Sequence, residues 1–274
     1  MFYKLLFDQN GIFFDPQEKG KIICKKIERQ APSYEVNYET FEGMNGSRET
    51  TASFRPFEIK MELDIFYKDE FEKTLILTDL YQKIFPGFSY YITYELEPGK
   101  RYFVNPTDLS VSEEGNGYSQ VSISYTAISG CSESLGKTVT DFSLSEEWQF
   151  GQGIDVEEDY KYIFETSAFV VYNGGDFVID PREHDLKISI EAISDSSFTI
   201  FNKTTGDRFV YYPEMDRNRG HKLIIEGVYP KINGVSCGID TNHGLITLAP
   251  GPNLIEIQNS LDTHSEWDFR FLYK

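Results

Sequence analysis

The segment from Gly130 to Thr138 ends in Gly-Lys-Thr, the residues that close a phosphate-binding loop, and it follows a strand-like run. In such a loop four residues separate the two glycines so that backbone amides converge on the phosphate, and a helix then adds its dipole. Here five residues lie between Gly130 and Gly136, and no helical pattern follows Thr138. The spacing therefore argues against nucleotide binding, and we predict no cofactor.

Candidate metal ligands are present without a complete set. His184 lies in the polar run of residues 180–185, but no second histidine at helical spacing and no cysteine pair accompanies it. A polar turn is the better interpretation. The acidic residues in the stretch 155–159 could supply oxygen ligands for calcium, yet they lack the spaced acidic loop with its glycine. We interpret that stretch as a solvated acidic loop and predict no metal site.

Candidate catalytic residues are equally incomplete. His264, Ser265 and Glu266 are adjacent, so on an extended chain their side chains alternate between faces and cannot form a relay by themselves. Neither His221 nor His243 has an adjacent serine motif. With 44 acidic residues, chance pairs are certain, and nothing singles out two carboxylates for glycoside hydrolysis. We therefore predict no catalytic residues and expect that the protein is not an enzyme.

Aromatic side chains leave one binding function open. Trp148 and Trp267 could stack on the apolar face of a pyranose ring, which makes them the candidate saccharide-binding residues. Aromatic side chains are also large hydrophobes, and most of the 40 phenylalanines and tyrosines must fill the core. A carbohydrate-binding β-sandwich that engages cell-wall saccharide is thus the alternative function.

Composition narrows the possible partners. The chain of 274 residues has a formal net charge of −18, which disfavours close approach to phosphate backbones and anionic lipid. We expect no specific nucleic-acid binding and no membrane partner, since no apolar run approaches the roughly 20 residues that cross a bilayer. The first residues lack a signal-peptide pattern, so we expect them to be part of the folded protein. The three cysteines are widely spaced, which argues against a disulfide framework.

The elements that position these residues are mostly strands. Residues 57–66 alternate strictly between apolar and charged side chains, which predicts a strand with one buried face. One helix is predicted at about residues 69–85, with Asp69 as N-cap and Pro86-Gly87 as its end. Apolar residues recur within it at helical spacing, namely Phe71, Leu75, Leu77 or Thr78, Tyr81 and Phe85. The remaining N-terminal pattern alternates turns with strand-like runs.

The last third of the chain is a ladder of short strands. Apolar runs at residues 198–201, 208–212, 223–226, 244–249 and 253–257 follow one another between turn signals, which predicts an antiparallel sandwich or jelly roll. Before it, from residue 129 to about 145, serine, glycine and threonine dominate and no period persists, as is typical of a linker. We therefore predict a mainly β chain with an N-terminal β domain and one helix at 1–130, a linker at 131–145, and a β-sandwich at 146–274.

Several short motifs carry a resemblance to a known family. These are Trp148-Gln-Phe-Gly-Gln-Gly-Ile154, Asn173-Gly-Gly-Asp176 followed by Ile179-Asp-Pro181, Leu248-Ala-Pro-Gly-Pro-Asn253, and in the N-terminal half Phe54-Arg-Pro-Phe57 and Ile84-Phe-Pro-Gly87. Together they resemble the distal tail protein of siphoviruses that infect Gram-positive bacteria. The resemblance extends over nearly the whole chain, and none of its motifs is catalytic.

The resemblance implies a structural hub. It implies a β-barrel-like N-terminal domain of which six copies form a ring at the distal end of the tail tube, and a galectin-like or jelly-roll C-terminal domain. The implied partners are further copies of the chain, the tail tube protein and the tail-associated lysin or fibre hub. The tape-measure protein and receptor-binding proteins are further partners that the resemblance allows. The implied location is the virion tail tip at the baseplate, after assembly in the host cytoplasm, where host adsorption begins.

Overall fold

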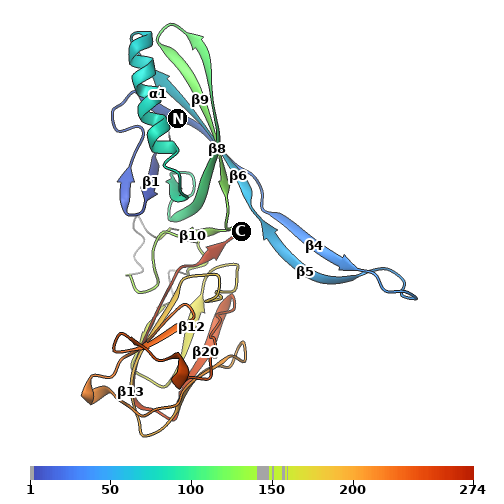
Figure 1. Cartoon of the computed structure of the whole chain (residues 1–274), viewed down its shortest axis with the longest axis vertical. Helices are drawn as coiled ribbons and strands as arrows, with labels where there is room; N and C mark the ends of the chain where they lie inside the picture. Colours follow the sequence, from blue (N-terminus) through green and yellow to red (C-terminus); the bar gives the residue numbers. More distant parts are fainter. Residues whose placement is uncertain (1–2, 141–147, 150, 156–157, 159) are drawn as a thin grey trace. The chain divides into compact units, whose positions relative to one another are not determined.

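The computed structural model describes residues 3–140, 148–149, 151–155, 158 and 160–274, and the chain divides into two compact units (Figure 1). Unit 1 extends to Ser132 and includes Lys274, and unit 2 comprises residues 133–273. Antiparallel strands dominate both units, and the described residues contain one α-helix. The prediction of a mainly β chain is therefore confirmed.

Unit 1 is an antiparallel sheet in which the predicted alternating strand is central. Its seven main strands follow the order β2-β1-β7-β8-β9-β6-β3. The strand β6 pairs along its full length with β9, from Phe57 opposite Ala127 to Phe66 opposite Tyr118. The strands are β1 (Leu5–Gln9), β2 (Ile12–Phe14), β3 (Ile22–Arg29), β6 (Phe57–Phe66), β7 (Tyr90–Tyr94), β8 (Lys100–Gly115) and β9 (Tyr118–Ala127).

The sheet of unit 1 curls until its edges approach each other. The backbone N–H of Tyr3, just before β1, donates to the carbonyl of Cys24 in β3, with 3.2 Å between the nitrogen and oxygen. The Gln17 side chain adds two bonds at the same seam, donating to the Tyr3 carbonyl and accepting from the Cys24 N–H. A curled sheet needs a filled interior. The inward residues of β6 supply part of it, since Ile59, Met61, Leu63 and Ile65 are fully buried.

The helix α1 (Glu70–Ile84) begins as predicted. The Asp69 carboxylate accepts a hydrogen bond from the Glu72 N–H at 2.8 Å, which satisfies one of the unpaired amides of the first turn. Leu80 and Ile84 are buried against the sheet. The apolar row that indicated the helix lies on another face: Phe71 is 75% exposed and Leu75 57%. The spacing thus identified the helix correctly, but the side that packs on the core differs from the row that indicated it.

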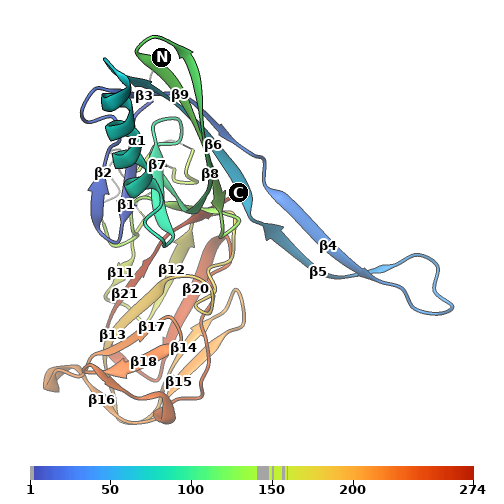
Figure 2. The same cartoon turned by 45° about the horizontal axis from the view of Figure 1, so that its top comes forward.

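Unit 2 is a sandwich of two sheets. One has the order β11-β21-β13-β17-β18-β19 with β16 paired to β13, and the other has the order β12-β20-β14-β15. Trp267 of β21 and Phe169 of β12 meet between the sheets, edge to face, with ring centroids 6.0 Å apart. Figure 2 shows the strands of both sheets. They are β11 (Ile163–Phe164), β12 (Ala168–Asn173), β13 (Leu186–Ser194), β14 (Phe198–Asn202), β15 (Arg208–Tyr211), β16 (Met215–Asp216), β17 (Leu223–Glu226), β18 (Tyr229–Ile232), β19 (Val235–Ser236), β20 (Gly251–Gln258) and β21 (Leu261–Phe269), with the short helices η1 (Arg217–Arg219) and η2 (Gly238–Asp240).

The prediction of a strand at residues 244–249 is wrong. That segment is extended, but its only strand-type pairing among the described residues is a single bridge between Leu248 and Ile179. Side chains satisfy its backbone instead, because the Asp207 carboxylate accepts from the Thr247 N–H at 2.9 Å. At Gly244 a Cβ would lie 1.9 Å from the Arg208 carbonyl oxygen, so glycine permits this close approach.

Part of the stretch predicted as a linker is packed into unit 2. Its described residues include the short strand β10 (Ser132–Ser134). The Ser134 N–H donates to the carbonyl of Phe271, the residue before β22 (Leu272–Tyr273). The Thr138 hydroxyl donates to the Trp267 carbonyl at 2.7 Å. Composition suggested a linker because serine and threonine replace apolar residues here, but their hydroxyls serve as hydrogen-bonding groups of the fold.

Candidate functional site

The residues that the sequence offered for phosphate, metal or catalytic chemistry lie at separate places in unit 2, where they form hydrogen bonds and ion pairs of the fold. Thr138 of the Gly-Lys-Thr run is buried, and its hydroxyl also accepts from the Phe269 N–H at 3.0 Å. Its neighbour Lys137 pairs with Asp268 at 3.1 Å. These groups hold the chain against β21 and form no cradle for a phosphate.

The histidines are likewise occupied within the fold. His184 Nδ1 accepts from the Asp180 N–H inside a turn, and burial lowers the pKa of His184. His264 lies 2.7 Å from the Glu165 carboxylate, while Ser265 is buried on the other face of β21 and accepts from the Trp267 indole N–H. The three residues 264–266 are therefore not brought together as a relay.

In the part of the chain that the structure describes, no three His, Cys, Asp or Glu side chains converge as a metal site. Two of the acidic residues considered for calcium, Glu157 and Asp159, lie outside the described residues. Cys24, Cys131 and Cys237 are buried thiols that form no disulfide, and burial raises the pKa of Cys24 to about 12. Thiols in this state are poor nucleophiles.

The two tryptophans proposed as a saccharide platform are core residues. Trp148 is 2% exposed and Trp267 is fully buried. Trp148 packs against Phe271 with ring centroids 5.5 Å apart, and Trp267 packs against Phe169. Neither indole presents a face on which a sugar ring could stack, so the assignment of Trp148 and Trp267 to saccharide binding is corrected.

A partly buried polar cluster in unit 1 contains an acid with a perturbed pKa, Glu97. Tyr94 and Tyr102 stack with ring centroids 5.3 Å apart, and both hydroxyls donate to Glu97 Oε2. The Arg29 guanidinium lies 3.6 Å from the same oxygen. Partial burial opposes ionisation of Glu97, but these hydrogen bonds and the charges of Arg29 and Lys100 outweigh it, so the pKa of Glu97 lies below its ordinary value.

This cluster predicts a pH-dependent contribution to stability. A carboxyl whose pKa is lower in the folded state stabilises the fold above its unfolded pKa, and the contribution is lost as pH falls through the folded pKa. We expect Glu97→Gln to lower the free energy of unfolding at pH 7 by about 2 kcal/mol, since hydrogen bonds to a charged acceptor are the stronger kind. Urea unfolding of both proteins between pH 7 and pH 3 tests this. The difference should shrink towards pH 3, and a constant difference would contradict the assignment.

The strands β4 (Ser33–Glu39) and β5 (Arg48–Arg55) form a two-stranded hairpin, which we name the arm. In the described residues β4 and β5 pair only with each other, and the arm extends away from the other strands of unit 1 (Figure 1). The Tyr34 and Phe54 rings meet near its base at 5.0 Å, and Arg55 forms an ion pair with Glu35 that lowers the pKa of that carboxyl. Its large apolar side chains are about half exposed or more, namely Tyr34, Tyr38, Phe41 and Met44.

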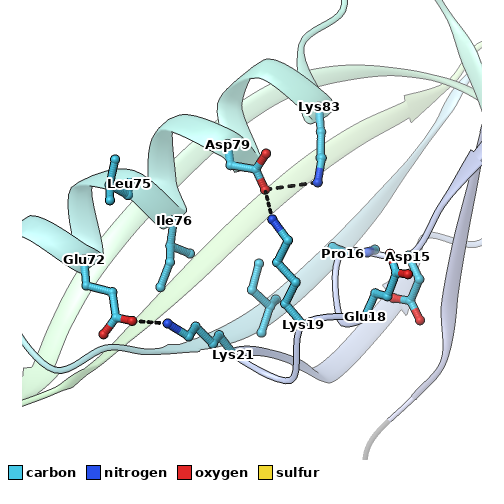
Figure 3. Close-up of a pocket in the computed structure, with 11 residues that line it drawn as sticks. Asp15, Pro16, Glu18, Lys19, Lys21, Glu72, Leu75, Ile76, Asp79 and Lys83 are labelled. Atoms are coloured by element: carbon cyan, nitrogen blue, oxygen red, sulfur yellow. Dashed lines mark hydrogen bonds and ion pairs between the residues drawn. The ribbon is translucent and has the colours of Figure 1, made fainter.

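A groove runs beside α1 in the same unit. It has a volume of about 240 Å³ and lies between the helix and the segment that leads from β2 into β3. Ile76 points from α1 towards that segment, whereas Leu75 lies on the side of the helix turned away from it (Figure 3). Charged residues surround these apolar side chains: Lys21 pairs with Glu72, and Asp79 pairs with both Lys83 at 3.0 Å and Lys19 at 3.8 Å.

The arm and the groove were not identified from the sequence. Residues 33–38 are one of the strand-like runs of the N-terminal pattern, but such a run cannot show that a strand has no covering sheet. The exposed row Phe71 and Leu75 was visible only as evidence for a helix.

Within the described part of the chain, no helix has the length and apolar character needed to span a membrane.

Comparison with known proteins finds one family model and several solved structures that resemble this chain. Residues 17–126 match the family model described as phage tail protein RIFT-related domain. The structure of the SPP1 Dit (gp 19.1) protein, described as a paradigm of hub adsorption apparatus in phages that infect Gram-positive hosts, matches with 13% identity and a TM-score of 0.70. That match covers 99% of this chain and 100% of the SPP1 chain, so the two share a fold over their full lengths.

Two further solved structures match more weakly. They are the phage P2 baseplate in its activated conformation with calcium, at 12% identity and a TM-score of 0.46, and the same baseplate with strontium, at 13% identity and a TM-score of 0.44. The matches cover 99% and 97% of this chain and 98% and 97% of the respective baseplate chains. No curated protein matches the sequence.

Proposed function

From the premise that this chain carries a phage tail protein domain and has the fold of a siphovirus distal tail hub protein, we propose that it forms a six-membered ring at the distal end of the tail tube. The ring links the tube to the baseplate and to the tail-associated lysin or fibre hub. The chain then acts by assembly and not by catalysis. It is built into the virion at the tail tip, after synthesis and assembly in the host cytoplasm.

The observation that carries ring formation is the arm. An isolated two-stranded hairpin is marginally stable in water, and the arm in addition exposes Tyr34, Tyr38, Phe41 and Met44. Exposed apolar surface of this kind is typical of a protein interface. Contacts in a ring are heterologous, so each copy must offer two different surfaces. The arm supplies one of them.

The negative charge of the chain is compatible with a ring that DNA traverses. A net charge of −18 repels phosphate, which lowers adhesion of nucleic acid to the protein. On this proposal the tape-measure protein and then the genome pass through the ring, and receptor-binding proteins attach further out. The alternative of a carbohydrate-binding module loses its support, since both tryptophans assigned to it are buried.

The mass and symmetry of the purified protein test the proposal. We expect light scattering to give six times the 31.6 kDa chain mass at high concentration, and negative-stain class averages to show a six-fold ring with a central hole. A chain that lacks residues 36–52, rejoined by a short glycine linker, should remain monomeric. A full chain that stays monomeric at every concentration, also with tail tube protein added, would contradict the proposed ring.

A further inference from the structure

The two sheets of unit 2 differ in the side chains that they turn to solvent. On the sheet that contains β13 and β17, charged residues form ion pairs, such as Glu191 with Lys222 at 3.1 Å. On the sheet β12-β20-β14-β15, Val170 of β12 lies opposite Leu254 of β20, and the two side chains are 47% and 41% exposed. Neighbouring apolar side chains that remain exposed on a sheet are typical of a surface that another protein covers.

The strand β12 ends its sheet and lacks the features that usually protect such an edge. It lies beside β20 in a continuous register (Figure 2), and no described strand pairs with its other side. Its sequence, Ala-Phe-Val-Val-Tyr-Asn, contains no charged residue and no proline. Natural proteins commonly block an open edge with lysine, proline or a bulge. An uncharged edge rich in β-branched and aromatic residues is suited to accept a further strand.

The register identifies the backbone groups of β12 that point to the open edge. The Ile257 N–H donates to the Ser167 carbonyl at 2.7 Å, so every second residue from Ser167 directs its N–H and C=O groups towards β20. Ala168 and Val170, which lie between, direct theirs to the opposite side. In the described residues the Thr166 hydroxyl donates to the Ala168 carbonyl at 3.1 Å. The N–H and C=O groups of Val170 therefore form the centre of the open edge.

Side chains close the far end of this edge. The Tyr162 hydroxyl donates to the Tyr172 carbonyl at 2.7 Å, and the Tyr160 ring stacks on Tyr172 with ring centroids 4.6 Å apart. The open stretch is thus limited to residues 168–171. An added strand can pair along this stretch and no further.

The charge of unit 2 favours a basic partner over a second copy of the chain. Residues 133–273 contain 24 acidic and 11 basic side chains, whereas the other residues contain 20 and 15. Just before β12, Glu165 pairs with Arg217 at 3.6 Å. The same guanidinium also pairs with Glu191 and Asp262, so three carboxylates share one cation. Two copies of this unit repel each other, whereas lysine or arginine on a partner is attracted.

We propose that β12 accepts an extended segment of a basic partner protein as an added strand along residues 168–171. Backbone hydrogen bonds to Val170 supply the affinity, and the exposed side chains of Val170 and Leu254 select apolar side chains at alternate positions of the segment. Lysine or arginine at the ends of the segment speeds association with the acidic unit. The inference concerns unit 2 alone, so it does not depend on the proposed ring.

Peptide binding to the full chain tests the inference. The probe is a fluorescein-labelled peptide, Lys-Lys-Val-Thr-Val-Thr-Val-Lys-Lys, and fluorescence anisotropy measures its affinity. One control peptide has glutamate in place of every lysine. A second has proline in place of the central valine, so it keeps the charge of the probe but lacks a strand N–H. We expect saturable binding of the probe with a Kd below about 1 mM, and at least roughly tenfold weaker binding of each control.

Variants of Val170 test the edge itself. Val170→Pro removes the N–H that points outwards and leaves the bonds to β20 in place, so it should weaken binding of the probe roughly tenfold or more. Val170→Thr is the matched control, because it keeps the N–H and the β-branched shape, and it should change the Kd less than about threefold. Thermal unfolding must show that both variants fold. Hydrogen exchange of the unmodified chain locates the contact independently of any variant.

The outcomes separate this inference from the proposed function. Slower amide exchange in β12 when the probe is bound, together with weaker binding to Val170→Pro, supports the inference. Equal binding of the three peptides, binding that Val170→Pro retains, protection outside β12, or no binding up to about 1 mM overturns it. Protection of β12 that rises with protein concentration without peptide overturns the basic partner as occupant and indicates a second copy instead. Ring formation enters none of these results, so the proposed ring stands or falls separately.

Discussion

Replacing Trp267 by alanine is expected to lower the free energy of unfolding of unit 2 by about 3–5 kcal/mol. The indole is fully buried between the two sheets, where it meets Phe169 at 6.0 Å and donates its N–H to the Ser265 hydroxyl at 3.3 Å. Truncation removes the apolar contacts, leaves a cavity, and strips a buried hydroxyl of its donor. Guanidinium unfolding followed by circular dichroism measures the loss.

Leu261→Ala is the matched control for Trp267→Ala. Leu261 begins the same strand, β21, but is 74% exposed, so its truncation should change stability by less than about 0.5 kcal/mol. A saccharide-binding function predicts the reverse for Trp267, namely an unchanged unfolding curve with loss of sugar binding. That result would return the indole to the role first considered for it and contradict its assignment to the core.

Asn253→Ala is expected to cost about 3 kcal/mol, because each buried polar group left without a partner costs roughly 1–3 kcal/mol. Asn253 is fully buried at the start of β20. Its amide N–H groups donate to the carbonyls of Ala249 and Gly251, and its oxygen accepts from the Ala249 N–H at 2.9 Å and from the Asn202 amide at 3.1 Å. One side chain thus closes the whole turn that precedes the strand.

Two further variants sharpen the Asn253 prediction. Asn253→Asp keeps the shape but replaces two N–H donors with a second acceptor facing carbonyl oxygens, so it should cost at least as much as the alanine variant. Leu254→Ala alters the next residue, which is 41% exposed, and should cost less than about 1 kcal/mol. If Asn253→Asp unfolded like the unmodified protein, the donated hydrogen bonds would not stabilise the turn.

Hydrogen bonds explain why asparagine stands in two of the motifs that carry the family resemblance, Asn173-Gly-Gly-Asp176 and Leu248-Ala-Pro-Gly-Pro-Asn253. Asn173 of Asn-Gly-Gly-Asp donates to the carbonyls of Phe177 and Leu248, and its oxygen accepts from the Gly175 N–H. Asn202 links Thr247 to Asn253. Three buried side-chain amides thus fix the loops at one end of the sandwich, in place of the regular strand that we expected at residues 244–249.

Elements that depend on local pattern could be predicted from the sequence. The strict alternation at residues 57–66 corresponds to β6 without a shift, and Asp69 caps α1 as its position before Glu70 and Glu72 suggested. The turn with Gly206 joins β14 to β15, and the glycine has the positive φ of 84° that a tight hairpin requires. Period, capping and turn chemistry act over a few residues, so the sequence alone determined them. It also determined the mainly β class and the resemblance to phage tail proteins.

Burial and exposure were decided only by the tertiary structure. Trp148 and Trp267 are hidden from solvent by partners far away in the sequence, such as Phe271 and Phe169, whereas Phe71 and Leu75 on α1 are exposed. The arm has the strand pattern of a core element, yet no described strand covers it. Local preference sets the type of an element, whereas the set of non-local contacts decides which face it hides and which it offers to a partner. For this protein the exposed faces carry the proposed function.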